Sequence, residues 1–340
     1  MRKLSHLGAF TKSTRDIINA NFLLAGFGTV GTVIYCNPAN GYDNSAEVNN
    51  PDKPYKTLAG AYAAATSGKN DVIVLVGDGS TTGTARVDTA ITWAKNATHL
   101  IGLGAPSMYG QRARIAPTST TVGASTNKDL ITVSGRGCYF ANVQIWAGFA
   151  TGIAATIGLT VSGANNCFEN CHIVGHADAA SAADTASYSL KVTASENYFK
   201  HCVIGTDTVL RTAANASVVF ASGAARTVFE DCVFPVYTSS TSSLIGSVPL
   251  TSPNGADRET IFENCKFLNM LNLTSVATML EAFNMVANGI NGYFLIKDCV
   301  RVNITNWGDT ATLLRLWLSG AGDEAQAGDE VGRALVASAT

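Results

Sequence analysis

The chain has 340 residues, 14% of them charged, and a formal net charge of −2 at pH 7. An average soluble domain has about 25% charged residues, and here Ala, Gly, Ser and Thr take their place. Without a basic run or a net positive charge, the sequence gives no electrostatic basis for binding nucleic acid or an anionic membrane, and we expect neither as a partner.

Residues 1–30 are predicted to form an N-terminal arm that contains a short amphipathic helix. Ser13 is a suitable N-cap because Asp16 follows three positions later, and the apolar segment that comes next ends at Gly26. Such an arm packs either on its own domain or on a neighbouring subunit.

The glycine motif at 26–31 matches the dinucleotide fingerprint G-x-G-x-x-G, but it follows a helix and leads into a predicted strand at 32–36. The fingerprint requires a strand, then the glycines, then a helix. We therefore interpret the motif as a flexible joint and expect no cofactor. The apolar stretch around it, 22–35, is too short and too rich in glycine to span a bilayer.

Residues 37–76 indicate how the main domain begins. A turn cluster at 37–44 is followed by a predicted short helix capped by Lys56 or Thr57, and then by a buried strand at 72–76. The x-N-G-x-D opening, the K-P-Y-K-T-L-A-G-A-Y-A-A-A helix and the V-I-V-L-V-G-D-G strand resemble the entry of right-handed parallel β-helix proteins of the pectin-lyase type. The resemblance implies that the helix caps the N-terminal end of the coil, where an unpaired strand edge would otherwise be exposed.

Six segments repeat one signature: an aromatic or aliphatic residue, a polar residue two positions later, and directly after it an apolar residue, usually Cys. The segments recur at intervals of 28 to 34 residues and begin at Phe140, Phe168, Phe199, Phe229, Phe262 and Ile296. Such a period indicates one structural unit stacked on itself. We therefore predict an all-β chain in which residues 31–318 form a single-stranded right-handed parallel β-helix of about eight rungs, followed by an extended C-terminal tail at 319–340.

Two columns of the signature are expected to face a shared apolar interior. Five cysteines hold the same place in successive repeats, and a free buried Cys behaves as a small apolar residue. No Cys pair or His partner has the spacing of a metal site, so we expect packed, reduced thiols and no metal, as in a protein folded in cytoplasm. The predicted core residues are Phe140, Phe168, Phe199, Phe229, Phe262, Cys171, Cys202, Cys232, Cys265 and Cys299.

The polar position of the signature predicts a bend. Phe168 and Cys171 lie three residues apart, so both face inward only if the chain turns between them. Asn, Asp and His are the residues that best tolerate the left-handed conformation of such a turn. The column resembles the asparagine ladder of parallel β-helices, and we interpret it as structural and not as catalytic or metal-binding. Its members are Asn142, Asn170, His201, Asp231, Asn264 and Asp298.

A polysaccharide hydrolase or lyase is the enzymatic alternative. Glycoside hydrolysis requires two carboxylates about 5 to 9.5 Å apart, and Asp207, Glu230 and Glu263 could supply them from neighbouring rungs. Two of these, however, fall in a predicted outward column of alternating charge, which comprises Glu169, Lys200, Glu230, Glu263 and Lys297. Three histidines could meet across two rungs but have no carboxylate or Cys on an obvious shared face: His172, His176 and His201. We therefore expect no catalytic site.

Two segments, 177–187 and 238–247, are nearly uncharged and rich in Ala, Ser and Thr, a composition suited to subunit contacts. The arrangement of the chain and its start, L-S-H-L-G-A-F-T-K-S-T-R-D-I-I-N-A-N-F, resemble virion structural proteins of tailed bacteriophages. The resemblance implies a homotrimer of β-helices assembled in the bacterial cytoplasm. We expect a capsid decoration (cement) protein that binds the major capsid protein on the capsid exterior; a short tailspike or fibre that binds or cleaves host polysaccharide is the alternative. The arm contacts expected under this hypothesis are Leu4, Leu7, Phe10, Ile17, Ile18 and Phe22.

Overall fold

The computed structural model describes residues 31–104, 107, 109, 113–119, 121–122, 128–148, 155–213, 215–221, 223–238, 248–250, 258–270, 279–285, 292–308 and 316–319. The predicted arm, 1–30, lies outside these residues, and so does the predicted tail apart from Ser319. The arm contacts Leu4, Leu7, Phe10, Ile17, Ile18 and Phe22 therefore remain predictions.

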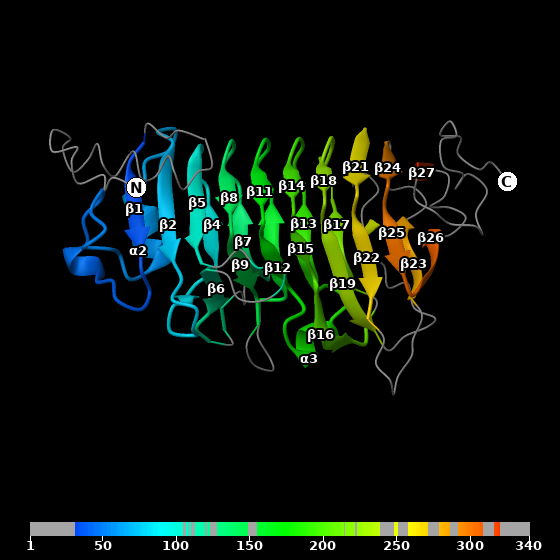
Figure 1. Cartoon of the computed structure of the whole chain (residues 1–340), viewed down its shortest axis with the longest axis horizontal. Helices are drawn as coiled ribbons and strands as arrows, with labels where there is room; N and C mark the ends of the chain where they lie inside the picture. Colours follow the sequence, from blue (N-terminus) through cyan, green and yellow to red (C-terminus); the bar gives the residue numbers. More distant parts are fainter. Residues whose placement is uncertain are drawn as a thin grey trace, which may run out of the picture.

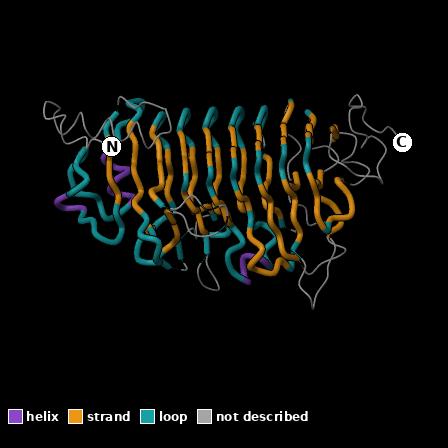
Figure 2. Tube along the Cα trace, in the orientation of Figure 1, coloured by secondary structure: helices purple, strands orange, loops and turns teal. Residues whose placement is uncertain are grey.

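The chain is an all-β parallel solenoid of about six turns with very little helix, so the all-β parallel coil is confirmed but the predicted number of about eight rungs was too high. Its strands stack along one long axis in parallel sheets (Figures 1 and 2). Sheet A has ten strands: β1 (Val33–Cys36), β2 (Asp71–Val76), β5 (Thr98–Leu103), β8 (Tyr139–Ala141), β11 (Cys167–Glu169), β14 (Tyr198–Lys200), β18 (Val228–Glu230), β21 (Glu259–Glu263), β24 (Tyr293–Lys297) and β27 (Leu316–Ser319).

Two further sheets close the coil. Sheet B has nine strands: β3 (Ala85–Val87), β6 (Ala113–Pro117), β9 (Val143–Trp146), β12 (His172–Val174), β15 (Val203–Ile204), β16 (Thr206–Arg211), β19 (Val233–Thr238), β22 (Lys266–Asn269) and β25 (Val300–Val302). Sheet C has eight: β4 (Ile91–Trp93), β7 (Asp129–Val133), β10 (Ile157–Val161), β13 (Tyr188–Val192), β17 (Ala216–Phe220), β20 (Val248–Leu250), β23 (Met279–Met285) and β26 (Ile304–Gly308).

The helical elements are short: η2 (Asp43–Ser45), α2 (Leu58–Ala64) and α3 (Ala179–Ala182). Thr57 is the N-cap of α2, and its hydroxyl accepts a hydrogen bond from the backbone N–H of Gly60 at 3.0 Å. Leu58 and Ala61 face the core, so α2 covers the N-terminal end of the solenoid (Figure 1). Among the described residues, no helix combines the length and the apolar character needed to cross a bilayer.

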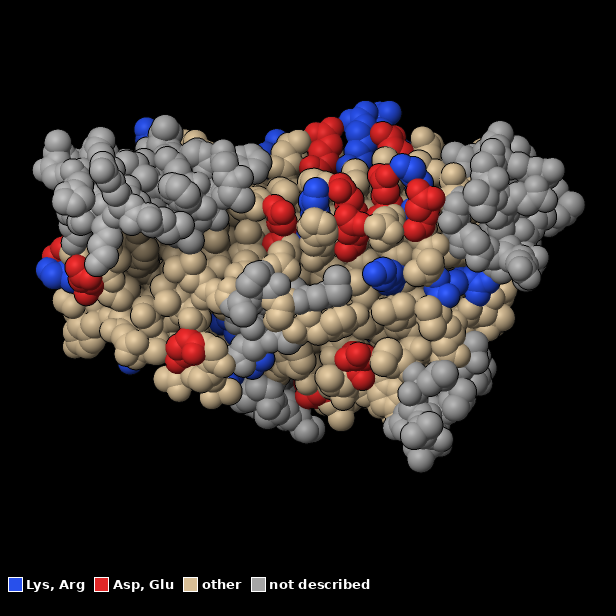
Figure 3. Space-filling view, in the orientation of Figure 1, with Lys and Arg blue, Asp and Glu red and all other residues tan. Residues whose placement is uncertain are grey.

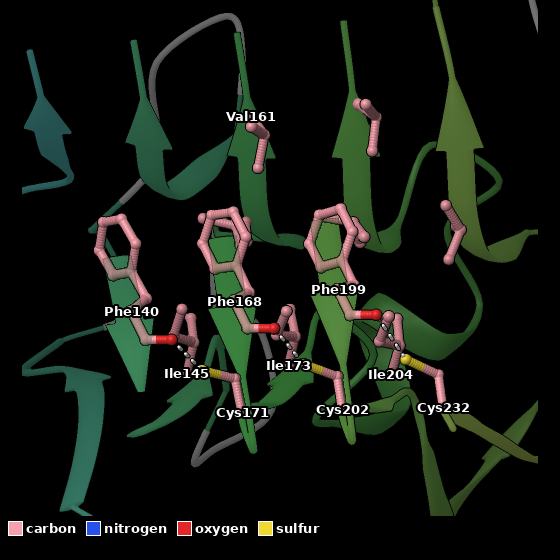
Figure 4. Close-up of a cluster of buried hydrophobic side chains, with 14 of the residues drawn as sticks. Phe140, Ile145, Val161, Phe168, Cys171, Ile173, Phe199, Cys202, Ile204 and Cys232 are labelled. Carbon is pink, nitrogen blue, oxygen red and sulfur yellow. Dashed lines mark hydrogen bonds between the residues drawn. The ribbon is translucent and has the colours of Figure 1, made fainter. Parts of the chain in front are cut away.

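The phenylalanines of the signature form a stack along the axis. Phe140, Phe168, Phe199, Phe229 and Phe262 are at most 1% exposed. Neighbouring rings lie 4.7 to 4.9 Å apart with interplanar angles of 4° to 12°, because parallel register places each ring on the equivalent residue of the next strand, one strand spacing away. In Figure 4 three of these rings share one orientation above the row of cysteines. Ile296 pairs with Phe262 and extends the column.

The chain turns between sheets A and B at the polar position of each signature. The six residues there have φ between 49° and 53°, the left-handed region that Asn and Asp adopt more readily than other non-glycine residues. Residues on either side of the turn can then both face the interior; Phe168 and Cys171, for example, are both fully buried. The residues at this bend are Asn142, Asn170, His201, Asp231, Asn264 and Asp298.

Candidate functional site

Side chains of the bend column bond along the solenoid axis. Asn142 donates to the carbonyl of Gly102 at 2.8 Å, and Asn170 donates to Oδ1 of Asn142 at 3.2 Å. Further along, Nε2 of His201 lies 3.2 Å from Oδ2 of Asp231, and Asn264 donates to the same carboxylate. The side chains of the column thus join neighbouring rungs by hydrogen bonds, and this structural role explains why polar residues occur there without invoking a ligand.

Backbone groups at the same bend also link neighbouring rungs. The N–H of Asn170 donates to the carbonyl of Lys200 at 2.9 Å, and the N–H of Asp298 donates to Ser319 at 2.8 Å. The turn therefore carries inter-rung hydrogen bonds through both its backbone and its side chains.

The column cysteines are free thiols buried in the core. Each sulfur lies 3.4 to 3.5 Å from the carbonyl oxygen of the phenylalanine one rung earlier, a contact drawn for three of them in Figure 4. Burial raises the pKa of Cys232 well above its ordinary value, so the thiol form is retained. In the part of the chain that the structure describes, no group of three or more His, Cys, Asp or Glu side chains could hold a metal ion. The five thiols are Cys171, Cys202, Cys232, Cys265 and Cys299.

The charged outer column lies on sheet A, where acidic and basic side chains gather along one edge of the middle rungs (Figure 3). Lys200 Nζ lies 3.2 Å from a carboxylate oxygen of Glu230, and Lys297 is paired with Glu263. The hydroxyl of Tyr198 also donates to Glu230, and this bond is the largest cause that lowers the pKa of the carboxyl, followed by Lys200. A general acid needs a raised pKa at neutral pH, so Glu230 is held in the wrong state for that role.

The three carboxylates considered for glycoside hydrolysis do not form one site. Glu230 and Glu263 are register neighbours on β18 and β21 of sheet A. Asp207 instead lies on β16, which pairs with β19 in sheet B. Asp207 was considered as a partner of these two from the preceding rung, but its strand follows the bend and lies in another sheet of the coil.

The three histidines likewise have separate surroundings. His172 on β12 lies 3.0 Å from Gln144 Nε2 and 3.1 Å from the carbonyl of Gly205. His176 bonds the carbonyl of Ser187 at 3.0 Å, while His201 belongs to the bend column. Each imidazole therefore serves a local structural contact.

A polar column on sheet B was missed in the sequence. Arg114 Nε donates to Oε1 of Gln144 at 2.7 Å, and Gln144 in turn contacts His172. The guanidinium carbon of Arg114 lies 5.8 Å from the ring centroid of Trp146, a cation–π distance. These positions are 30 and 28 residues apart, so extending the repeat period to every polar residue would have found them. Gln144 and His172 are buried and bonded to each other, which leaves little of the column available to a ligand.

The first rungs of sheet A carry an apolar surface on the side opposite the core. Val33 pairs with Val72, and Val74 pairs with Ile101, while the alternate residues of the same strands line the core. We call the set Val33, Tyr35, Val72, Val74 and Ile101 the apolar outer face; all five are at most 8% exposed. Strands that are apolar on both faces are normally covered on both. Two rungs later this surface gives way to the charged outer column.

No protein-family model and no curated protein matches the sequence. Solved structures do match the fold. Pectin methylesterase from Erwinia chrysanthemi is 14% identical, with a TM-score of 0.55 over 87% of this chain and 92% of that one. Carrot pectin methylesterase is 15% identical, with a TM-score of 0.54 over 90% of each chain. A pectate lyase is 16% identical, with a TM-score of 0.53 over 80% of this chain and 64% of that one. The chain therefore has the right-handed parallel β-helix of the pectin-lyase-like fold.

Proposed function

We propose that the chain is a non-enzymatic structural protein of a tailed-phage virion: a capsid decoration protein that binds the shell as a β-helix homotrimer and stabilises it. Binding only the assembled shell stabilises that state by mass action. A rigid solenoid suits this role, since its stacked rungs present fixed outer surfaces to several neighbours at once.

The observation that carries the proposal is that acidic side chains on and beside sheet A are bonded to side chains of neighbouring rungs. Asp231 bonds along the axis to His201 and Asn264, and Glu230 is paired with Lys200. Chemistry on a polysaccharide would require carboxylates with separated acid and base roles in a cleft. In this chain the carboxylates on sheet A are instead used to join rungs, which favours a structural role.

Copy number in purified particles tests the location. Quantitative mass spectrometry on tailed-phage particles from the source culture should find hundreds of copies per particle, and light scattering on the free protein should give the mass of a trimer. A handful of copies per particle would instead favour the tailspike or fibre, and absence from particles would refute the virion proposal.

Removal of residues 1–25 tests the arm. The truncated chain should retain the circular dichroism spectrum of the solenoid but no longer co-sediment with shells that lack the full-length protein. Full-strength binding by the truncated chain would refute the role of the arm. Incubation of the full chain with host surface polysaccharide serves as the second readout, because release of oligosaccharides would establish an enzyme.

A further inference from the structure

Two arginines lie on the outer face of sheet B, on its first two strands, β3 and β6. The residues on either side of Arg86 on β3 and of Arg114 on β6 line the core, so both arginines face outward. Arg86 is in register with Ala116, which lies two residues beyond Arg114 on the same strand. The two guanidinium groups therefore come from diagonal positions on neighbouring strands, and we call Arg86 and Arg114 the arginine pair.

Buried side chains on the next two rungs orient the guanidinium of Arg114. Arg114, Gln144 and His172 are register neighbours on β6, β9 and β12. His172 Nε2 donates to the carbonyl of Gly205 at 3.1 Å, so its Nδ1 accepts from Gln144 Nε2 at 3.0 Å. The amide oxygen of Gln144 is thereby turned toward Arg114 and accepts from its Nε at 2.7 Å. Because Gln144 and His172 are at most 5% exposed, these bonds hold the guanidinium in one orientation.

The outer edge of this guanidinium is available to a ligand. Among the described residues, Nε of Arg114 has a hydrogen-bond partner, whereas Nη1 and Nη2 have none. The side chain is partly exposed, and neither nitrogen is enclosed, in contrast to Nη1 of Arg211. Two donors along one edge of a guanidinium match the two oxygens of a carboxylate.

In the part of the chain that the structure describes, no carboxylate forms an ion pair with Arg114. Asp88, close to the pair in sequence, is exposed. Burial is the largest cause that lowers the pKa of Arg114, and the like charge of Arg86 lowers it further. A guanidinium nevertheless stays protonated at neutral pH. The arginine pair is therefore a local concentration of positive charge that a carboxylate from outside would stabilise.

We propose that the arginine pair binds a carboxylate in an acidic segment of a partner protein, with Nη1 and Nη2 of Arg114 as the bidentate donors and Arg86 as the second charge. The surroundings favour a polypeptide over a glycan or a nucleic acid. The guanidinium carbon of Arg114 lies over the ring of Trp146, 5.8 Å from its centroid, so this ring face is not open to stack a sugar or a base. Two arginines also form no extended basic stripe. The site is separate from the predicted arm and does not rest on the virion proposal.

Fluorescence anisotropy with a labelled hexaglutamate peptide tests the site in the full chain at low ionic strength. The wild type should bind the peptide, and Arg114→Gln should weaken binding about tenfold because bonds to a charged carboxylate are lost. Arg226→Gln is the matched control: it removes an exposed guanidinium already paired with Glu196 at 3.0 Å, and it should change the affinity less than about twofold. Absence of binding, or equal losses in the two variants, would overturn the proposal. Tighter binding of hexagalacturonate or of a single-stranded oligonucleotide than of the peptide would refute the choice of a polypeptide.

Chemical protection of the wild-type chain provides a test that does not depend on a variant folding. Phenylglyoxal modifies accessible arginines, and mass spectrometry of a digest reports the rate at each position. Saturating hexaglutamate should slow the modification of Arg114 and leave that of Arg226 unchanged. An unchanged rate at Arg114, or equal protection of Arg226, would refute the site.

Discussion

Asn170 allows the backbone and side-chain contributions of the bend to be separated. Its φ of 49° places it in the left-handed region, and its side chain donates to Asn142 at 3.2 Å. Asn170→Ala should lose the hydrogen bond, worth about 1 kcal/mol, and should add roughly 1 kcal/mol of backbone strain. Asn170→Gly should lose the same bond without that strain. We expect unfolding free energies lower by about 2 kcal/mol for the alanine variant and about 1 kcal/mol for the glycine variant.

Urea unfolding followed by circular dichroism measures both changes, and an unaltered slope would show that the same surface is exposed in each variant. Asn165 is the matched control: its φ is 61°, but its amide donates to Glu196 at 2.8 Å at an exposed site outside the bend column. Asn165→Gly should be close to neutral. Equal stability of Asn170→Ala and wild type, or equal losses in Asn170→Ala and Asn170→Gly, would contradict the reasoning.

Four further outcomes follow from the described contacts. Glu230→Gln should lower the free energy of unfolding by about 0.5 kcal/mol at pH 7. Because folding lowers the pKa of Glu230, its contribution to stability is present above the ordinary carboxyl pKa and is lost as the pH falls. The difference in unfolding free energy between the two proteins, measured as a function of pH, should therefore vanish below about pH 4. Val74→Thr, on the fully buried apolar outer face, should cost about 1–3 kcal/mol in urea unfolding, whereas Val302→Thr, at a site 53% exposed, should be neutral; equal effects would mean that the outer face is not dry. Ellman's reagent at pH 8 should modify the eight cysteines of the sequence only after unfolding, since even the half-buried Cys167 has its pKa raised by burial to about 12; rapid labelling of the native chain would contradict this. Phe199→Ala should lower the unfolding free energy by about 3–5 kcal/mol, because the ring is fully buried in the stack; a loss below 1 kcal/mol in urea would show that the stack adds little.

The features that could be predicted from the sequence are those that recur in successive rungs. Parallel stacking gives equivalent positions of successive rungs the same environment. The same type of residue, such as the inward phenylalanine at Phe168 and Phe199, therefore recurs at the repeat period and can be recognised in the sequence. The fold could be predicted for this reason. The outward Glu230 and Glu263 were also found because they recur in register.

Features that do not repeat were predicted less well. The position of Asp207 could not be predicted, because β16 is a local addition beside β19 and its register shifts along the pairing. The buried contacts of Arg211 with His176 and Ser217 were not predicted, because Arg211 lies on β16, a strand outside the regular stacking order of sheet B. The column of Arg114 and Gln144 does follow the period, but no aromatic residue recurs within it to mark it in the sequence.

The physical origin of the repeat also limits what the fold says about function. A solenoid is stabilised by inward columns, here rings 4.7 to 4.9 Å apart and thiols bonded to carbonyls, and these leave its outer columns free to differ. Pectin-active enzymes with the same fold are 14 to 16% identical to this chain, a level at which the shared core accounts for the likeness. Function must therefore be argued from the outer positions. In this chain they change along sheet A from the apolar Val74 and Ile101 to the ion-paired Glu230 and Lys200, a division that suits one packed end and one solvated end better than a catalytic cleft.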